Sequence, residues 1–158
     1  RCVIDMSVDT MAMLFELKNI AGVKDATGDP NRIDATLKKL GPDFIQLTGE
    51  DGFALEFNRR GGVGIISVTA NIAPKLCSDF QKYSKSKTDN EIKEAERIDQ
   101  ILQPIHKSLF IESNPAPVKY AAKLLGLCGD EIRLPLVKIK KETEDQVKKA
   151  LLSAKLLS

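Results

Sequence analysis

Three short apolar runs, separated by polar turns and amphipathic helical segments, constrain the fold of this sequence more than any other feature. The runs are 20–23, 44–47 and 63–68. Apolar runs that alternate with amphipathic helices predict a parallel sheet with helices on its faces. Three strands cannot close a barrel, because the smallest packed barrel of parallel strands needs about eight. The expected fold class is therefore α/β, with an incomplete parallel sheet.

The sequence changes character after the third run, at Pro74. Before it, Ser7 is placed to cap a helix that runs to about 18, and further helices are expected over 30–40 and 53–59. After it, no strand is predicted, and helices are expected over 74–83, 88–105, 118–125 and 142–157. Thr88 and Glu91 have the spacing of a capping box. We therefore predict an α/β domain over 1–73 and a helical domain over 74–158.

The composition excludes several classes of protein. The net charge is +2 and no Trp is present, which argues against a nucleic-acid partner or an acidic membrane surface. The apolar runs are too short to span a bilayer. Three scattered cysteines predict a reducing, cytoplasmic location and no thiolate metal site. The spacing of His, Asp and Glu predicts no other metal site, and Arg1 in place of Met suggests part of a longer protein.

Lys24 is the strongest candidate for a reactive residue. It ends the first apolar run and opens the polar turn 25–29, so its amine is expected at the carboxyl end of a buried strand. Parallel α/β sheets bind their ligands at this edge. An amine that loses hydration there favours its neutral form, which attacks carbonyl carbons to give a Schiff base. The alternative is a strand-end lysine with a packed stem and a hydrated head.

Two further segments are expected at the same edge of the sheet. Gly49 follows the second run and lets a ligand approach the backbone, although a plain strand-to-helix turn explains it equally well. The stretch 66–71 ends the third run with polar side chains. The convergence of these segments with Lys24 favours a binding site. His106, the only histidine, is expected to be a packed helix residue and not a catalytic base.

Several motifs resemble those of the 4-hydroxy-tetrahydrodipicolinate synthase (dihydrodipicolinate synthase) family, and they occur in the family's order along essentially the whole chain. They are Gly22-Val23-Lys24-Asp25-Ala26-Thr27-Gly28, Leu47-Thr48-Gly49-Glu50-Asp51, Gly64-Ile65-Ile66-Ser67-Val68-Thr69-Ala70-Asn71, Leu109-Phe110-Ile111-Glu112-Ser113-Asn114-Pro115 and Arg133-Leu134-Pro135-Leu136. The resemblance implies a (β/α)8 barrel with a C-terminal helical domain. The chain is similar to the second half, with the last three barrel strands and the helical domain.

The resemblance also implies an activity, which is the cofactor-free condensation of pyruvate with L-aspartate 4-semialdehyde by a cytoplasmic lyase of lysine and diaminopimelate biosynthesis. Lys24 would form the Schiff base. Arg1 would bind the aldehyde's carboxylate, Gly49 would line the pocket and the Ile66 carbonyl would face the lysine, while Thr27 and Asn71 would support the site. The family resemblance suggests a homotetramer.

Two alternatives stay open. One is a sibling pyruvate-dependent keto-acid aldolase, similar to N-acetylneuraminate lyase. The other is a non-catalytic, self-associating half-barrel, because a sheet of three parallel strands leaves exposed edges. The family's proton-relay residues belong to the half that does not match this sequence. The isolated 158 residues are accordingly expected to be inactive.

Overall fold

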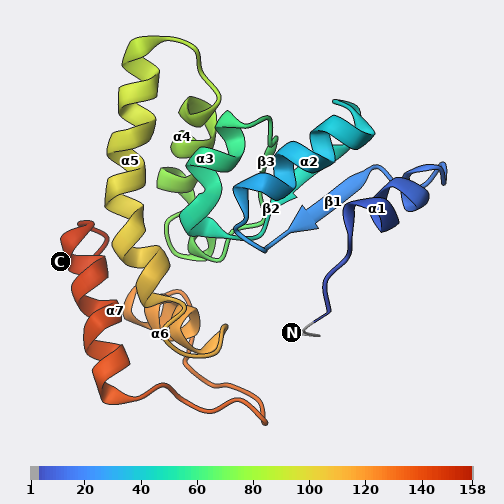
Figure 1. The fold of residues 1–158 in the computed structure, drawn as a ribbon. Coiled ribbons are helices and arrows are strands. Elements are labelled where there is room, and N and C mark those ends of the chain that lie inside the picture. The colour runs from blue at the N-terminus through green and yellow to red at the C-terminus, as the bar shows by residue number, and fades with distance from the viewer. Residues whose placement is uncertain (1–3, 158) are drawn as a thin grey trace. The chain divides into compact units, whose positions relative to one another are not determined.

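A computed structural model describes residues 4–157, which divide into two compact units. Unit 1 ends at Ile66 and unit 2 begins at Ser67. The α/β character predicted from the sequence is confirmed, since a parallel sheet lies in unit 1 and the described part of unit 2 contains helices and no strand (Figure 1).

Unit 1 is a small parallel sheet with helices between its strands. The sheet order is β1-β2-β3, and both pairings are parallel. Along the chain the elements are α1 (Val8–Phe15), β1 (Gly22–Asp25), α2 (Pro30–Leu40), β2 (Ile45–Thr48), the 3-10 turn η1 (Asp51–Phe53), α3 (Ala54–Arg59) and β3 (Gly64–Ile65). This order reproduces the predicted alternation of strands and helices.

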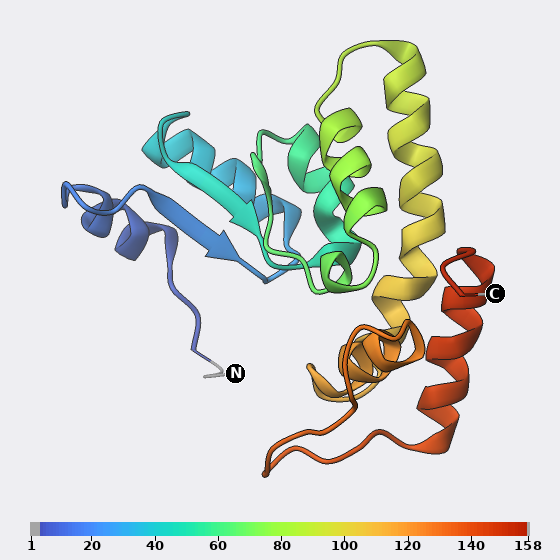
Figure 2. The same cartoon turned by 180° about the vertical axis from the view of Figure 1, so that it is seen from behind.

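Helices α2 and α3 cover one face of this sheet. Ile33 of α2, Gln46 of β2 and Phe57 of α3 line one small cavity, and the Gln46 amide donates a hydrogen bond to the Ile33 carbonyl at 3.4 Å. The strands alternate, so Gln46 is buried while its neighbour Ile45 is 44% exposed on the opposite face. Figure 2 shows β1 and β2 from the side that α2 does not cover.

The turn before α2 forms as the sequence predicts. The Asp29 side chain accepts a hydrogen bond from the Asn31 amide at 2.9 Å, and Pro30 occupies the first helical position. Gly41 ends the helix with φ of 82°, a conformation that favours glycine. These signals fix where the chain leaves β1 and where it returns to β2.

All regular secondary structure in the described part of unit 2 is helical. Its elements are the 3-10 turn η2 (Thr69–Asn71), α4 (Pro74–Ser84), α5 (Asp89–Ser108), α6 (Ala116–Leu124) and α7 (Lys141–Ser153). The core of this unit gathers on α5, α6 and α7, with side chains that are nearly or fully inaccessible: Ala95, Ile98, Leu102, Ile105, Leu109, Ala121, Val147 and Leu151. The four helices predicted after Pro74 are all present.

Some predicted boundaries are wrong in detail. The first strand covers 22–25 and not 20–23, and the third is limited to 64–65 because the chain turns at Ser67, whose hydroxyl accepts a hydrogen bond from the Ala70 amide at 2.9 Å. The capping box is also absent, because the Glu91 carboxylate accepts hydrogen bonds from the hydroxyls of Ser86 and Thr88. Strand ends depend on the partner strand, which apolar patterning does not specify.

The turn η2 belongs to the helical unit. Thr69 is fully buried, and its hydroxyl lies 2.7 Å from Nδ1 of His106 on α5. His106 is itself 6% exposed, as expected of a packed helix residue. The compact helical unit thus starts before Pro74, and the division into domains 1–73 and 74–158 stays a prediction.

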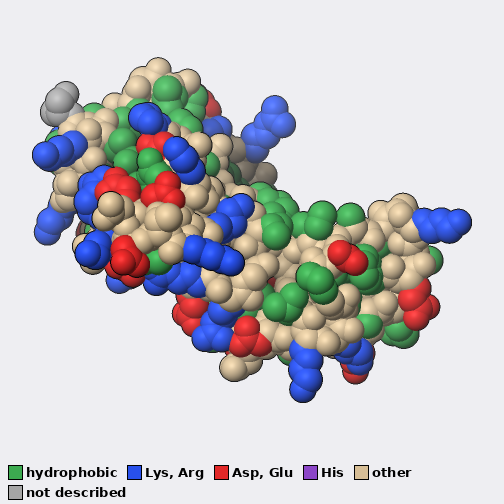
Figure 3. Space-filling model, turned by 90° about the horizontal axis from the view of Figure 1, so that it is seen from above, with side chains coloured by type: hydrophobic (Ala, Val, Ile, Leu, Met, Phe, Trp, Pro, Cys, Tyr) green, Lys and Arg blue, Asp and Glu red, His purple; other side chains and the backbone are tan. Residues whose placement is uncertain are grey.

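Hydrophobic side chains also reach the surface. Leu134 and Val137, in the segment between α6 and α7, are 85% and 65% exposed. On the face shown in Figure 3, hydrophobic side chains lie among acidic and basic ones. Within residues 4–157, no helix combines the length and the apolar character needed to cross a bilayer.

Candidate active site

Lys24 lies in β1, one residue before its end. We expected it to follow the strand, but it pairs with Leu47 of β2 and therefore belongs to the ladder. Both side chains point to the sheet face opposite α2 and α3, and Lys24 is exposed there. We expected the amine to lose hydration. The described residues of unit 1 do not shield it from solvent, because none of them covers this face of the sheet.

Gly49 lies directly against the Lys24 side chain. A Cβ atom at position 49 would be 2.5 Å from Cε of Lys24 and 3.0 Å from Cβ of Ala26, so only glycine leaves room for the lysine in this position. The Gly49 amide also donates a hydrogen bond to the Asp25 carbonyl at 2.6 Å. The space that the sequence suggested for a ligand is thus occupied by the stem of the lysine, which lies across the end of β2.

Ile66 continues the same edge of the sheet. Its amide donates a hydrogen bond to the Thr48 carbonyl at 2.9 Å, which extends the pairing of β2 and β3 by one residue. Its side chain is 49% exposed. Lys24, Gly49 and Ile66 therefore lie at the carboxyl ends of three adjacent parallel strands, the edge where such sheets bind ligands. Arg1, the remaining predicted site residue, lies outside the described residues.

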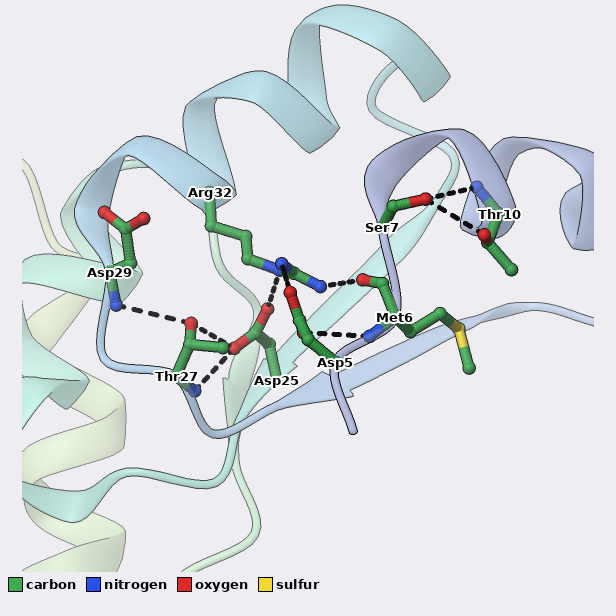
Figure 4. A network of polar contacts seen from close by, with 8 residues as sticks. All are labelled: Asp5, Met6, Ser7, Thr10, Asp25, Thr27, Asp29 and Arg32. Carbon is green, nitrogen blue, oxygen red and sulfur yellow. Dashed lines mark hydrogen bonds and ion pairs between the residues drawn. The ribbon is translucent and has the colours of Figure 1, made fainter. Parts of the chain in front are cut away.

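A polar network holds the turn that follows Lys24 (Figure 4). The amide and the hydroxyl of Thr27 donate to Oδ1 of Asp25, at 2.7 and 2.6 Å. The other carboxylate oxygen, Oδ2, lies 2.7 Å from Nε of Arg32 on α2. Sequence reasoning assigned Thr27 a supporting role but missed Arg32. The only local signal for Arg32 is its place in the first turn of α2, close to the acidic residues Asp25 and Asp29.

Two other motif residues have local roles in unit 2. The Asn71 side chain donates a hydrogen bond to the Val68 carbonyl at 2.9 Å and so stabilises its own turn. The Glu112 carboxylate accepts a hydrogen bond from the Lys140 amide at 2.9 Å, at the start of α7. Hydrogen bonds from the Thr143 hydroxyl and the Lys140 amide lower the pKa of Glu112. Glu112 therefore acts as an N-terminal cap supplied from a distant loop.

The chemistry available at this edge of the sheet is that of the Lys24 amine. Across residues 4–157, no cluster of three or more His, Cys, Asp or Glu side chains is placed to hold a metal ion. A lysine amine on an open sheet face, at the edge formed by three strand ends, can add to a small carbonyl compound. The Schiff-base role of Lys24 stays a prediction, and its side chain is exposed in the described chain.

Known proteins match the chain along nearly its whole length. The model of the dihydrodipicolinate synthetase family matches residues 1–154. A 4-hydroxy-tetrahydrodipicolinate synthase of Pelagibacter ubique is 71% identical over 99% of this chain and 54% of its own length. The chain spans about half the length of the curated relatives that it matches.

Solved structures agree with the sequence matches. The dihydrodipicolinate synthase of Aquifex aeolicus superposes with a TM-score of 0.91 at 35% identity, over 99% of this chain and 53% of that one. The enzyme of Acinetobacter baumannii, solved in complex with pyruvate, superposes with a TM-score of 0.90 at 38% identity, over 97% of this chain and 52% of that one. Fold, motif order and sequence identity thus agree, and the chain belongs to the dihydrodipicolinate synthetase family.

Proposed function

We propose that this chain supplies the reactive lysine of an enzyme that condenses pyruvate with L-aspartate 4-semialdehyde. The observation that carries the proposal is the position of Lys24, whose stem lies against Gly49 at the carboxyl edge of a parallel sheet in a chain of this family. We use "full-length protein" for a protein of the relatives' length that contains these 158 residues. The activity is proposed for that protein.

The full-length protein would cover the open face of the sheet. We propose that β1, β2 and β3 are the last three strands of a (β/α)8 barrel, which is consistent with a match to about half of each relative. The other strands would then enclose Lys24 and Ile45 on the barrel interior. Enclosure removes water from the amine and favours its neutral, nucleophilic form. The exposure of Lys24 in the described chain follows from the incomplete sheet.

The chemistry follows from a neutral amine held near a keto acid. Nζ of Lys24 adds to the carbonyl carbon of pyruvate, and loss of water leaves a protonated imine. The imine withdraws electrons, so a methyl proton is lost and an enamine forms. The enamine carbon attacks the aldehyde carbon of the semialdehyde. The amino group of that substrate then attacks the imine carbon, which closes the ring and releases the lysine.

The remaining site residues have roles by family likeness. Arg1 would bind the carboxylate of the aldehyde substrate, Gly49 would form part of the pocket wall and the Ile66 carbonyl would face the lysine. We propose no metal or organic cofactor, because the protonated imine itself accepts the electrons. By family resemblance, we propose that the full-length protein is a cytoplasmic homotetramer that acts in lysine and diaminopimelate biosynthesis.

The proposal is tested by steady-state turnover of the full-length protein. Lys24→Arg keeps the charge but loses the nucleophile, so we expect turnover to fall to background. Lys38→Arg is the matched control, because Lys38 is an exposed lysine on α2. Equal activity of the two variants would contradict the proposal. Faster cleavage of sialic acid or other sugar keto acids than condensation with the semialdehyde would instead favour the sibling aldolase.

A second candidate function concerns the isolated 158 residues. Ile45 and Ile66 are about half exposed on the sheet face that also carries Lys24. Burying such a face stabilises an assembly, which favours self-association of a non-catalytic half-barrel. We expect the purified 158-residue chain to self-associate in sedimentation and to show negligible turnover. A monomer with steady turnover would contradict both expectations.

A further inference from the structure

We propose that Arg32 is a positioning residue that sets the geometry of Lys24 through its neighbour Asp25. The inference rests on the proposed function, because it concerns the rate at which Lys24 forms its imine. Arg32 lies in the first turn of α2 and is only 14% exposed at its side chain. Its guanidinium joins three groups that come from two separate segments of unit 1 (Figure 4).

The first contact fixes the end of β1. Nε of Arg32 forms an ion pair with Oδ2 of Asp25 at 2.7 Å, without the alignment of a hydrogen bond, and the Asp25 side chain is 12% exposed. The other oxygen of this carboxylate accepts two hydrogen bonds from Thr27, so both oxygens of Asp25 are engaged. The Asp25 carbonyl in turn accepts the Gly49 amide at 2.6 Å. Asp25 therefore connects α2, the turn after Lys24 and the glycine on which the lysine lies.

The second contact fixes the segment before α1. Nη1 of Arg32 lies 2.6 Å from Oδ2 of Asp5, and Nη2 donates a hydrogen bond to the Met6 carbonyl. A planar guanidinium can hold these partners together with Asp25, whereas a lysine ammonium has no such fork. Arg32 thus ties the strand of the reactive lysine to residues 5–6, which lie shortly after the predicted substrate ligand Arg1.

The strand geometry explains why Arg32 positions the lysine without touching substrate. Successive residues of a strand point to opposite faces, so Asp25 points toward α2 and Lys24 points to the open face. The guanidinium lies on the helix side of the sheet. Loss of the contact would let the end of β1 shift, and a misplacement of about 1 Å near a reacting group can slow chemistry by about 100-fold.

Arg60 provides a matched control in the same unit. Its guanidinium contacts Asp34 Oδ2 at 2.6 Å and Glu56 Oε1 at 2.7 Å, so it also binds two carboxylates. Neither partner adjoins Lys24 in the sequence. If the loss of any ion pair slowed imine formation, Arg32→Gln and Arg60→Gln would be slowed alike. A positioning role of Arg32 predicts that only Arg32→Gln is slowed.

The experiment measures imine formation in the full-length protein, by borohydride trapping of pyruvate at timed intervals followed by mass analysis. We expect Arg32→Gln to lower the rate constant at saturating pyruvate by about 10-fold or more, with less than about a twofold change in the half-saturating pyruvate concentration. Arg60→Gln is expected to keep the wild-type rate. Arg32→Lys keeps the charge without the fork, so it is also expected to be slower than Arg60→Gln.

Each outcome decides a different question. If wild type forms no adduct at Lys24, the proposed function fails and the role of Arg32 fails with it. If wild type forms the adduct and Arg32→Gln matches Arg60→Gln, the proposed function stands and the positioning role is overturned. If Arg32→Gln does not fold, the comparison of Arg32→Lys with Arg60→Gln decides, and equal rates overturn the role.

Discussion

Units 1 and 2 bury their hydrophobic residues in different ways. In unit 2 the core side chains of α5 and α7 are enclosed, and Ile105 and Leu151 have no exposed surface. In the described part of unit 1, helices cover one face of the sheet, and Ile45 is 44% exposed on the other. Unit 2 therefore has an enclosed core, while the sheet of unit 1 has an exposed apolar face that further chain could bury. Lys24, the proposed reactive lysine, lies on that exposed face.

The largest expected effect is the difference in the free energy of unfolding between Ile105→Ala and Ile45→Ala. In the 158-residue chain, truncating the buried Ile105 should lower the free energy of unfolding by about 3 kcal/mol, because a cavity remains. At protein concentrations low enough to keep this chain monomeric, truncating Ile45 should lower the free energy of unfolding by less than about 0.5 kcal/mol, because Ile45 is 44% exposed. Urea denaturation measures both values.

The same pair of variants sharpens the comparison in the full-length protein. If other strands cover the face there, Ile45→Ala should lower the free energy of unfolding by about 2 kcal/mol or more. A cost for Ile45→Ala that is small in both proteins would show that the face stays open, against the proposed barrel.

The next effect concerns Gly49, which we expect to serve chemistry more than stability. Gly49→Ala would place a Cβ atom 2.5 Å from Cε of Lys24, so the flexible lysine must move. We expect turnover of the full-length protein to fall by about 10-fold or more, with little change in the urea midpoint. Ala26→Gly is the control that removes a methyl group from the same contact. Unchanged turnover in Gly49→Ala would contradict the assigned place of the lysine.

A smaller effect is expected at the buried pair in unit 2. Thr69→Val removes the hydroxyl that lies 2.7 Å from Nδ1 of His106, at nearly constant volume. We expect a loss of about 1 kcal/mol in the free energy of unfolding. Thr69→Ser keeps the hydroxyl and should recover the hydrogen bond. If Thr69→Val were as stable as wild type, the pair would not stabilise the start of unit 2.

The smallest effect is a pH dependence at Glu112. Its pKa is lowered by hydrogen bonds from Thr143 and Lys140, so the ionised form stabilises the fold. A lowered pKa in the folded state means that this contribution is present above about pH 4.3 and is lost as the pH falls below that value. Glu112→Gln should lower the urea midpoint at pH 7 and reduce its change between pH 6 and pH 3. An unchanged pH profile would contradict the capping role.

The sequence predicted the elements of the fold better than their ends. The apolar runs and the turn signals at Asp29-Pro30 and Gly41 predicted the strands and α2, because these signals act within a few residues. The third strand was predicted too long, because Ser67 starts a turn by hydrogen bonding to the backbone. Such side-chain turns compete with strands and leave little trace in a hydrophobic pattern.

The sequence predicted where the candidate site lies. It did not predict the contacts and the solvent exposure of the site residues. Parallel strands place their carboxyl ends together, so the sequence could bring Lys24, Gly49 and Ile66 to one edge. It could not find Arg32, because the chain has 24 basic and 22 acidic residues and many pairings are possible. It also could not show that Lys24 is exposed, since hydration depends on which faces of the sheet are covered.

Locating the covalent pyruvate adduct tests directly whether Lys24 is the reactive lysine. The full-length protein is treated with pyruvate and borohydride, digested and mapped by peptide mass analysis, with Lys24→Arg treated in parallel. We expect a reduced pyruvate adduct on the peptide that contains Lys24, and none on that peptide in the variant. An adduct confined to another lysine, or no adduct in an active enzyme, would contradict this expectation.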